Sequence, residues 1–294
     1  MTSTLLVQSL VLGVLLGGLY ALLAAGLTLY FGVMRVVMIA HSAFLILAAY
    51  LAWYFHQQTG LDPLLSLVVT VPLFFLVGVG MQRLLITRLR PATLTMMSVL
   101  LTFAVALFIE GMIGFVWSGT QRRIQLPYSG ASIELFGAQI AVVKLVAFAL
   151  AALSLGLLYV LMKHSRFGQA LRATIQHREA AQLVGIKTDR VAGFGFGLGL
   201  ATAAVGGTAL SLDATIYPSL HWHWIGPLMA IIVVGGLGSI PGAAIAAMVL
   251  GIGQSLLQVP LGTTWAQTIF YVALFVTLML RPQGFFGGRL AQRF

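Results

Sequence analysis

Residues 1–34 read MTSTLLVQSLVLGVLLGGLYALLAAGLTLYFGVM, a stretch that contains no lysine, arginine, aspartate or glutamate. A helix needs about 20 apolar residues to cross the roughly 30 Å of hydrocarbon in a bilayer, and this stretch exceeds that length. Residues 1–4 also lack the positive charge with which a signal peptide begins. We therefore expect a retained first transmembrane helix.

Further windows without charged residues follow along the chain, at 36–61, 63–82, 91–109, 145–162, 191–212 and 214–280. Only helices and closed barrels satisfy the backbone in lipid, and these windows are continuously apolar rather than alternating. The last window is long enough for two or three crossings. We expect spans near 5–30, 40–56, 64–83, 93–117, 140–162 and 191–212, followed by segments near 226–235, 242–258 and 265–280.

The composition excludes a water-soluble globule. Hydrophobic residues make up 60% of the chain and charged residues only 7%, whereas a soluble domain carries roughly 25% charged residues. The absence of cysteine excludes disulfides and iron–sulfur clusters. Many of the 33 glycines recur at four-residue spacing, as at Gly193 and Gly197, which lets helices approach closely in lipid. We predict an all-α polytopic membrane protein with about 8–9 transmembrane helices, formed by 1–294 as a single domain.

We attribute the net charge of +10 to the orientation of the chain in the membrane rather than to an affinity for nucleic acid. Lysine and arginine are enriched in cytoplasmic loops. With the N-terminus in the periplasm and the C-terminus in the cytoplasm, only Arg122, Arg123 and Lys144 lie outside. The cytoplasmic side receives Arg35, Arg83, Arg88, Arg90, Lys163, Arg166, Arg172, Arg178, Lys187, Arg190, Arg281, Arg289 and Arg293. We expect a multi-pass protein of the bacterial inner membrane.

Residues 235–242 read GGLGSIPG and separate two apolar segments, the first of which is too short to cross fully. One interpretation is a broken or re-entrant pair of half-helices, which transporters place beside a pathway. Gly236, Gly238 and Ser239 are then candidates for the translocation path. The alternative is a tight loop between helices.

Three more polar residues are candidates for the path. Glu110 lies within a span, where a carboxylate is costly and faces either a pathway or a buried hydrogen-bond partner. His41 and Ser42 could line the path, although for His41 we favour a histidine at a helix end that bonds to the backbone. The run His221-Trp222-His223-Trp224 fits an aromatic belt better than a metal site, because Asp213 is the only possible third ligand nearby in the sequence.

Residues 163–190 read KHSRFGQALRATIQHREAAQLVGIKTDR and form the most polar stretch of the chain. An apolar stripe predicts short helices, and its members are Phe167, Ala170, Leu171, Thr174, Ala181 and Val184. Such helices suit either a groove on a soluble partner or a layer of anionic lipid headgroups.

Within this stretch, Glu179-Ala180-Ala181 followed by Gly185 resembles the EAA loop of ABC-importer permeases. The surrounding residues, together with blocks at 32–50, 234–242 and 281–287, resemble more specifically the permease family for high-affinity branched-chain amino acid uptake, in its shorter, H-type subunit. The resemblance implies a single permease domain over 1–294 with a cytoplasmic coupling segment at 163–190. The expected ATPase-coupling residues are Arg166, Gly168, Arg172, Glu179, Ala180, Ala181 and Gly185.

The resemblance also implies partners. A second homologous permease subunit would complete the path, two cytoplasmic ATP-binding subunits would drive it, and a periplasmic substrate-binding protein would deliver the substrate. The chain contains no phosphate-binding loop, so we expect ATP and magnesium only in the partner ATPases, and no cofactor or enzymatic activity here. Met38, Ser42 and Ala43 depart from the family pattern around His41, which leaves related amino acids, amides, urea and small organic acids open as substrates. An ion-coupled secondary transporter or channel remains the alternative, with Glu110 as its only acid well inside a span.

Overall fold

The apolar segments predicted from the sequence are helices in the computed structural model, which describes residues 3–34, 36–89, 93–135 and 138–287. Arg35, Arg90, Arg289 and Arg293 lie outside the described residues. The long helices are α1 (Ser3–Met34), α2 (Ala40–Thr59), α3 (Leu67–Leu84), α4 (Leu94–Trp117), α5 (Val142–His164), α8 (Thr188–Asp213), α9 (His221–Gly235), α10 (Ile240–Ala266) and α11 (Thr268–Leu280). The shorter helices are α6 (Arg166–Gln176) and α7 (Arg178–Leu183), with 3₁₀ turns at Pro63–Ser66, Ile86–Arg88 and Pro218–Leu220.

An all-α polytopic fold is confirmed. Within the described residues, six helical segments are long and apolar enough to cross a membrane by length and composition. The other predicted segments also form helices, namely α2, α9 and α11, but α2 is buried and less apolar and the other two are short. The expected total of 8–9 crossings stays a prediction.

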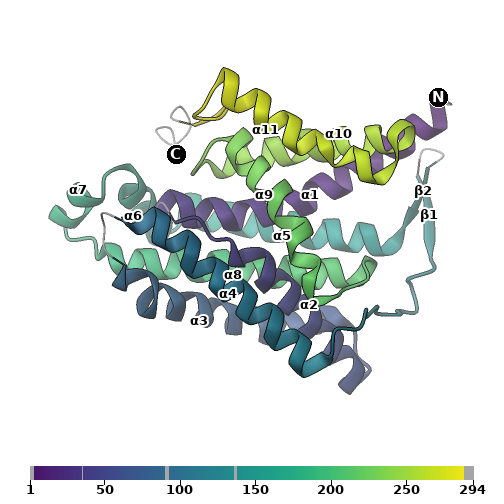
Figure 1. The fold of residues 1–294 in the computed structure, drawn as a ribbon, viewed down its shortest axis with the longest axis horizontal. Helices are drawn as coiled ribbons and strands as arrows, with labels where there is room; N and C mark the ends of the chain where they lie inside the picture. The colour runs from purple at the N-terminus through teal and green to yellow at the C-terminus, as the bar shows by residue number, and fades with distance from the viewer. Residues whose placement is uncertain (1–2, 35, 90–92, 136–137, 288–294) are drawn as a thin grey trace.

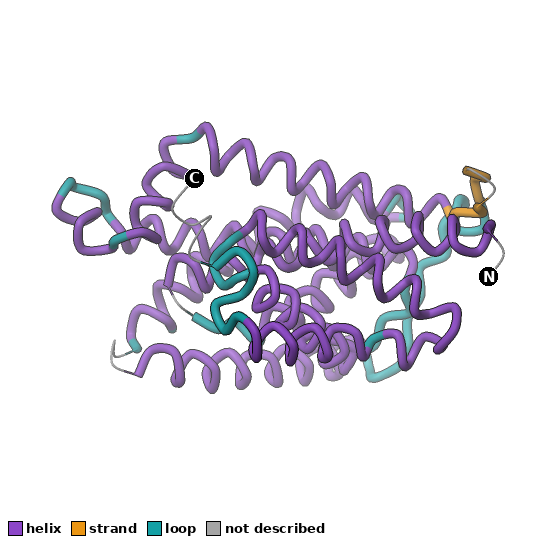
Figure 2. Tube along the Cα trace, turned by 90° about the horizontal axis from the view of Figure 1, so that it is seen from above, coloured by secondary structure: helices purple, strands orange, loops and turns teal. Residues whose placement is uncertain are grey.

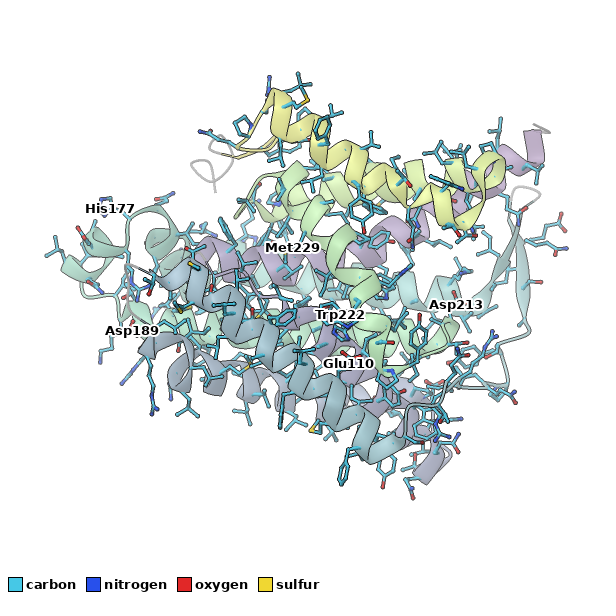
Figure 3. The ribbon with its side chains drawn as sticks, viewed as in Figure 1. Glu110, His177, Asp189, Asp213, Trp222 and Met229 are labelled. Carbon is cyan, nitrogen blue, oxygen red and sulfur yellow. The ribbon has the colours of Figure 1, made fainter. Side chains whose placement is uncertain are left out.

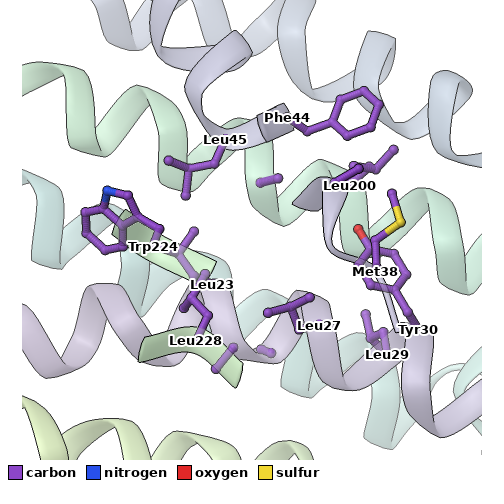
Figure 4. Packing of buried hydrophobic residues seen from close by; sticks show 14 of the residues in the cluster. Leu23, Leu27, Leu29, Tyr30, Met38, Phe44, Leu45, Leu200, Trp224 and Leu228 are labelled. Atoms are coloured by element: carbon purple, nitrogen blue, oxygen red, sulfur yellow. The ribbon is translucent and has the colours of Figure 1, made fainter. Parts of the chain in front are cut away.

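The helices run side by side along the long axis of the molecule, with α8 and the second half of α1 near its centre (Figure 1). Helix α8 is almost wholly buried and contacts α1, α2, α3, α5 and α6, whereas α4 and α5 leave most of their apolar surface exposed. Most buried apolar residues form one continuous cluster, which Figure 4 shows around Leu23, Leu27 and Leu45. The exposed apolar faces of the outer helices are those expected to meet lipid.

Glycines allow the helix backbones to approach closely. A Cβ atom added to Gly17 of α1 would lie 2.9 Å from the Cα of Met248 in α10. One added to Gly78 of α3 would lie 2.8 Å from the Cα of Gly197 in α8. Apolar side chains gain little by leaving lipid for another helix, so such close backbone contact supplies much of the packing energy.

The two ends of the helix bundle differ in charge. One end carries α6 and α7, and the other carries the antiparallel hairpin of β1 (Ser132–Leu135) and β2 (Ala138–Ala141), in which Ile133 pairs with Ile140 (Figures 1 and 2). We call them the α6–α7 end and the hairpin end. The α6–α7 end receives the described basic residues Arg83, Arg88, Lys163, Arg166, Arg172, Arg178, Lys187, Arg190 and Arg281, and the hairpin end receives Arg122, Arg123 and Lys144. The described basic residues thus fall into the two groups that the sequence predicted.

Residues 236–239 form a tight turn between α9 and α10. Gly236 and Gly238 have φ angles of 99° and 85°, which side chains other than glycine rarely adopt. The Gly242 amide donates a hydrogen bond of 3.1 Å to Ser239 Oγ, so Ser239 caps α10. Helix α9 has 15 residues, or about 22 Å, and is therefore too short to span the bilayer alone. The re-entrant interpretation stays a prediction.

One feature agrees with the expected end of a segment near residue 258, and one differs. Helix α10 is interrupted by a kink at Gly262, which has φ 78° and ψ 168°, two residues after Pro260. The hairpin of β1 and β2 was not expected from an all-apolar pattern of helices, because four-residue strands leave too short an alternation to recognise.

We predict that Gly78→Leu lowers the thermal unfolding midpoint of the purified protein in detergent, because overpacking against the α8 backbone costs about 1–3 kcal/mol. Gly80→Leu on the same helix is the matched control, since a Cβ there meets nothing within 4 Å. Equal midpoints for the two variants would contradict the α3–α8 contact.

Candidate functional site

The predicted coupling segment forms a helical hairpin at the α6–α7 end. Ser165 caps α6, since its Oγ accepts a hydrogen bond of 2.9 Å from the Gly168 amide. His177 ends α6 and caps α7, since its Nδ1 accepts a hydrogen bond of 3.3 Å from the Ala180 amide. Because the helix breaks at His177, residues 166–183 form two short helices instead of one.

Gly168 and Arg172 hold α6 against the end of α5. A Cβ at Gly168 would clash with the Met162 carbonyl oxygen, and the Arg172 guanidinium donates to the same oxygen. These two predicted coupling residues therefore position α6. Arg166 differs from them, because its side chain is exposed.

The EAA motif has a structural explanation in α7. Ala181 is buried, and its carbonyl accepts a hydrogen bond of 3.0 Å from the Ile186 amide, while the Gln182 carbonyl accepts one of 3.0 Å from Gly185. This pair of bonds is the Schellman motif, which requires a residue of positive φ after the helix, and Gly185 has a φ of 84°. The spacing between Ala181 and Gly185 thus fixes where α7 ends.

The tip of this hairpin exposes apolar side chains to solvent. Leu183 is 89% exposed and Val184 is 77% exposed, and Glu179 and Ala180 beside them are also exposed. Of the predicted apolar stripe, Ala181 is buried against the bundle, whereas Val184 faces solvent. Leu183 was not singled out from the sequence, and its place just before the Schellman turn is the only signal that could have revealed it.

Beneath the hairpin lies an open groove of about 670 Å³ with a mixed polar and apolar lining. It runs between the end of α1, α3, α6, α7 and the start of α8, and Gln82, Thr87 and Thr174 line it. At the edge of the groove, Arg178 Nη2 and Asp189 Oδ1 form an ion pair at 2.7 Å. A small apolar pocket of about 120 Å³ lies between α5, α6 and the turn at Gly238 and Ser239.

The six predicted path residues lie in three separate places. Gly236, Gly238 and Ser239 lie together at the α6–α7 end. His41 and Ser42 lie in the interior at the start of α2, where both are buried, His41 Nδ1 is 3.2 Å from the Tyr30 hydroxyl, and Ser42 donates to the Ile39 carbonyl.

Glu110 lies apart from the others, on α4 toward the hairpin end. Its Oε2 accepts a hydrogen bond of 3.2 Å from the Trp222 indole and lies 3.7 Å from His221 Nε2. Trp222 and Glu110 are close together in Figure 3, on the face formed by α4 and α9. His221 and Trp222 were read in the sequence as part of an aromatic belt, and only the fold brings them to this carboxylate.

Ion pairs and hydrogen bonds secure the hairpin end. Lys144 of α5 pairs with Asp213 at the end of α8. The Tyr128 hydroxyl donates a hydrogen bond of 2.7 Å to Asp62, and burial together with this bond raises the pKa of Tyr128. Within the ranges that the structure describes, no group of three or more histidine, aspartate or glutamate side chains could hold a metal ion.

Comparison with known proteins gives a consistent result. A family described as branched-chain amino acid transport system / permease component matches residues 9–279. The chain is 26% identical to the high-affinity branched-chain amino acid transport system permease protein LivH of Salmonella typhimurium, over 95% of each chain. It is 28% identical to the probable permease LivH of Methanocaldococcus jannaschii, over 93% of this chain and 90% of that one, and 24% identical to BraD of Pseudomonas aeruginosa, over 95% of each. No solved structure matches.

We predict that Gly185→Val accelerates hydrogen exchange of the 185 and 186 amides, because a β-branched residue at positive φ breaks the Schellman turn. Gly185→Asn is the matched control and should exchange nearly as slowly as the wild type, since asparagine tolerates this conformation. Fast exchange in all three proteins would show that the turn is not stable in solution.

Proposed function

The chain belongs to the branched-chain amino acid transport system permease family, and we propose that it is the membrane-spanning permease subunit of an ATP-driven importer. Homologues in this family are named as permeases, which move a solute without transforming it. The proposed substrates are branched-chain or related amino acids, delivered by a periplasmic binding protein. A second homologous permease subunit and two cytoplasmic ATP-binding subunits complete the assembly.

The single observation that carries this proposal is the exposed tip of the α6–α7 hairpin. A tip of large apolar residues in water is costly unless a partner covers it. Leu183 and Val184 form its apolar centre, and Glu179 and Arg178 supply a charged edge. This pattern of an apolar centre and a polar rim suits docking into a groove of an ATPase.

Gly168 and Arg172 would couple a movement of the tip to helix α5. They hold α6 tightly to α5, so a displacement of the tip would reach a membrane-spanning helix directly. The groove beneath the hairpin leaves room for such a movement. We assign the ATPase-docking role to the tip, and the transmitting role to Gly168 and Arg172.

The proposed orientation follows from the charges. The α6–α7 end, which carries most of the described basic residues, faces the cytoplasm, and the hairpin end faces the periplasm. The binding protein would then meet the segment from Ser118 to Ala141, which the bond between Tyr128 and Asp62 fastens to the bundle.

We further propose that the translocation path follows the face formed by α4 and α9, from Glu110 toward Gly236, Gly238 and Ser239. Helix α9 is a half-length helix that ends in backbone of positive φ, which is the kind of element that lines transport pathways. His41 and Ser42 lie behind this face, so their contribution would be to support α1 and α8.

Uptake by the reconstituted assembly tests the proposed function. We expect leucine to accumulate in vesicles only when the binding protein, the ATPase subunits and ATP are present together. Uptake by this chain alone, driven by an ion gradient, would instead support the secondary-transporter alternative.

We predict that Leu183→Asp lowers co-purification of the ATPase subunits at least about tenfold, because a buried unpaired carboxylate disfavours an interface by more than 1.4 kcal/mol. Glu179→Lys should have the same direction of effect. Ile133→Asp is a control, since Ile133 is also exposed but lies at the hairpin end. Normal co-purification of both tip variants would show that the ATPases dock elsewhere.

A further inference from the structure

The Glu110 carboxylate lies inside the membrane-spanning part of the chain. It is seven residues before Trp117, the last residue of α4, which corresponds to about 10 Å along the helix axis. An ionised carboxylate at such a depth is costly and requires compensation by a cation, by hydrogen-bond donors or by water. How this carboxylate is compensated is therefore informative about function.

The described residues supply incomplete compensation. The Trp222 indole donates one hydrogen bond to Oε2. No lysine or arginine nitrogen in the described part of the chain lies within 4 Å of the carboxylate. Arg122, which follows α4, instead donates to the Trp117 carbonyl and stacks on Trp53.

His221 adds a second unsatisfied acceptor. Its side chain is 1% exposed, and its Nδ1 lies 3.1 Å from the Pro218 carbonyl oxygen. A carbonyl oxygen only accepts, so Nδ1 carries a hydrogen, and Nε2 of the neutral ring is an acceptor. This buried Nε2 has no hydrogen-bond partner and lies 3.7 Å from Glu110 Oε2. When the ring is uncharged, Nε2 and the Glu110 carboxylate are both acceptors with no donor between them.

The face that holds these acceptors is open. The Glu110 side chain is 26% exposed and the Trp222 residue 40% exposed. A charge at this depth does not face lipid without a large penalty, so the face meets water or a second subunit. Met229 lies seven residues after Trp222 on α9, on the same side of that helix, and is half-buried (Figure 3).

We propose that Glu110, His221 and Trp222 form a binding site for the ammonium group of an amino acid on the translocation path, an inference that rests on the proposed function. An ammonium group has three donors and no acceptor, so it can bond to the carboxylate and to Nε2 at the same time. The indole ring of Trp222 packs against Phe103 at 5.7 Å and against His221 at 4.4 Å, which holds its N–H group toward the carboxylate. The site selects for a positive charge in the substrate and leaves its side chain free.

The absence of native cysteine makes this proposal directly testable. We introduce Met229→Cys into the full assembly in membrane vesicles, and measure modification by a cationic and by an anionic methanethiosulfonate reagent. In the wild-type background we expect both to react, with a ratio of cationic to anionic rates that falls at least about fivefold in Glu110→Gln. Glu110→Asp, which keeps the charge, should keep most of the ratio.

A matched control is available on α4. Phe108 is 71% exposed and lies two residues before Glu110, on another side of the helix. We expect Phe108→Cys to react with neither reagent, because it faces lipid. An unreactive Met229→Cys, or a ratio unchanged by Glu110→Gln, would overturn the proposed site.

Protection by ligand tests the ammonium group itself. Leucine at millimolar concentration should slow modification of Met229→Cys, whereas 4-methylpentanoate, which lacks the amino group, should not. Glu110→Gln should abolish the protection. Equal protection by both compounds would overturn recognition of the ammonium group. These rates require no transport, so they stay interpretable even if uptake proves independent of ATP.

Discussion

The cost of placing a charge in hydrocarbon organises this protein. Charged residues make up only 7% of the chain, and the described ones other than Glu110 lie at the ends of the helix bundle. The penalty therefore determines where the spans begin and end and which loops share a side. The same penalty applies to Glu110 within α4, whose carboxylate requires a cation, hydrogen-bond donors or water to offset it.

A second consequence concerns how the helices hold together. Lipid removes most of the hydrophobic drive for helix association, so backbone contact through glycine replaces it. Gly78 against Gly197 and Gly17 against Met248 bring α3 to α8 and α1 to α10. Helix α8 is almost completely buried in this packing, whereas α4 and α5 leave most of their residues exposed.

The polar residues gather where the chain would meet other molecules. At the α6–α7 end, a Schellman turn at Gly185 ends α7 and leaves Leu183 and Val184 in solvent. Toward the hairpin end, Glu110 Oε2 and His221 Nε2 lie 3.7 Å apart. The first site matches the apolar protein partner, and the second the cationic group, that are proposed above for a permease of this family.

The sequence by itself determined the helices, the sorting of charges between the ends and the family, because hydropathy and the EAA spacing act over a few neighbouring residues. Pro260 also indicated where α10 is interrupted, since the backbone leaves the helical conformation at Gly262. The sequence did not show that Val184 is exposed, because its burial depends on how the two short helices separated at His177 pack on the bundle. Only the tertiary structure decided that His221 and Trp222 meet Glu110, since 111 positions separate His221 from the carboxylate and only the packing of the helices brings them together.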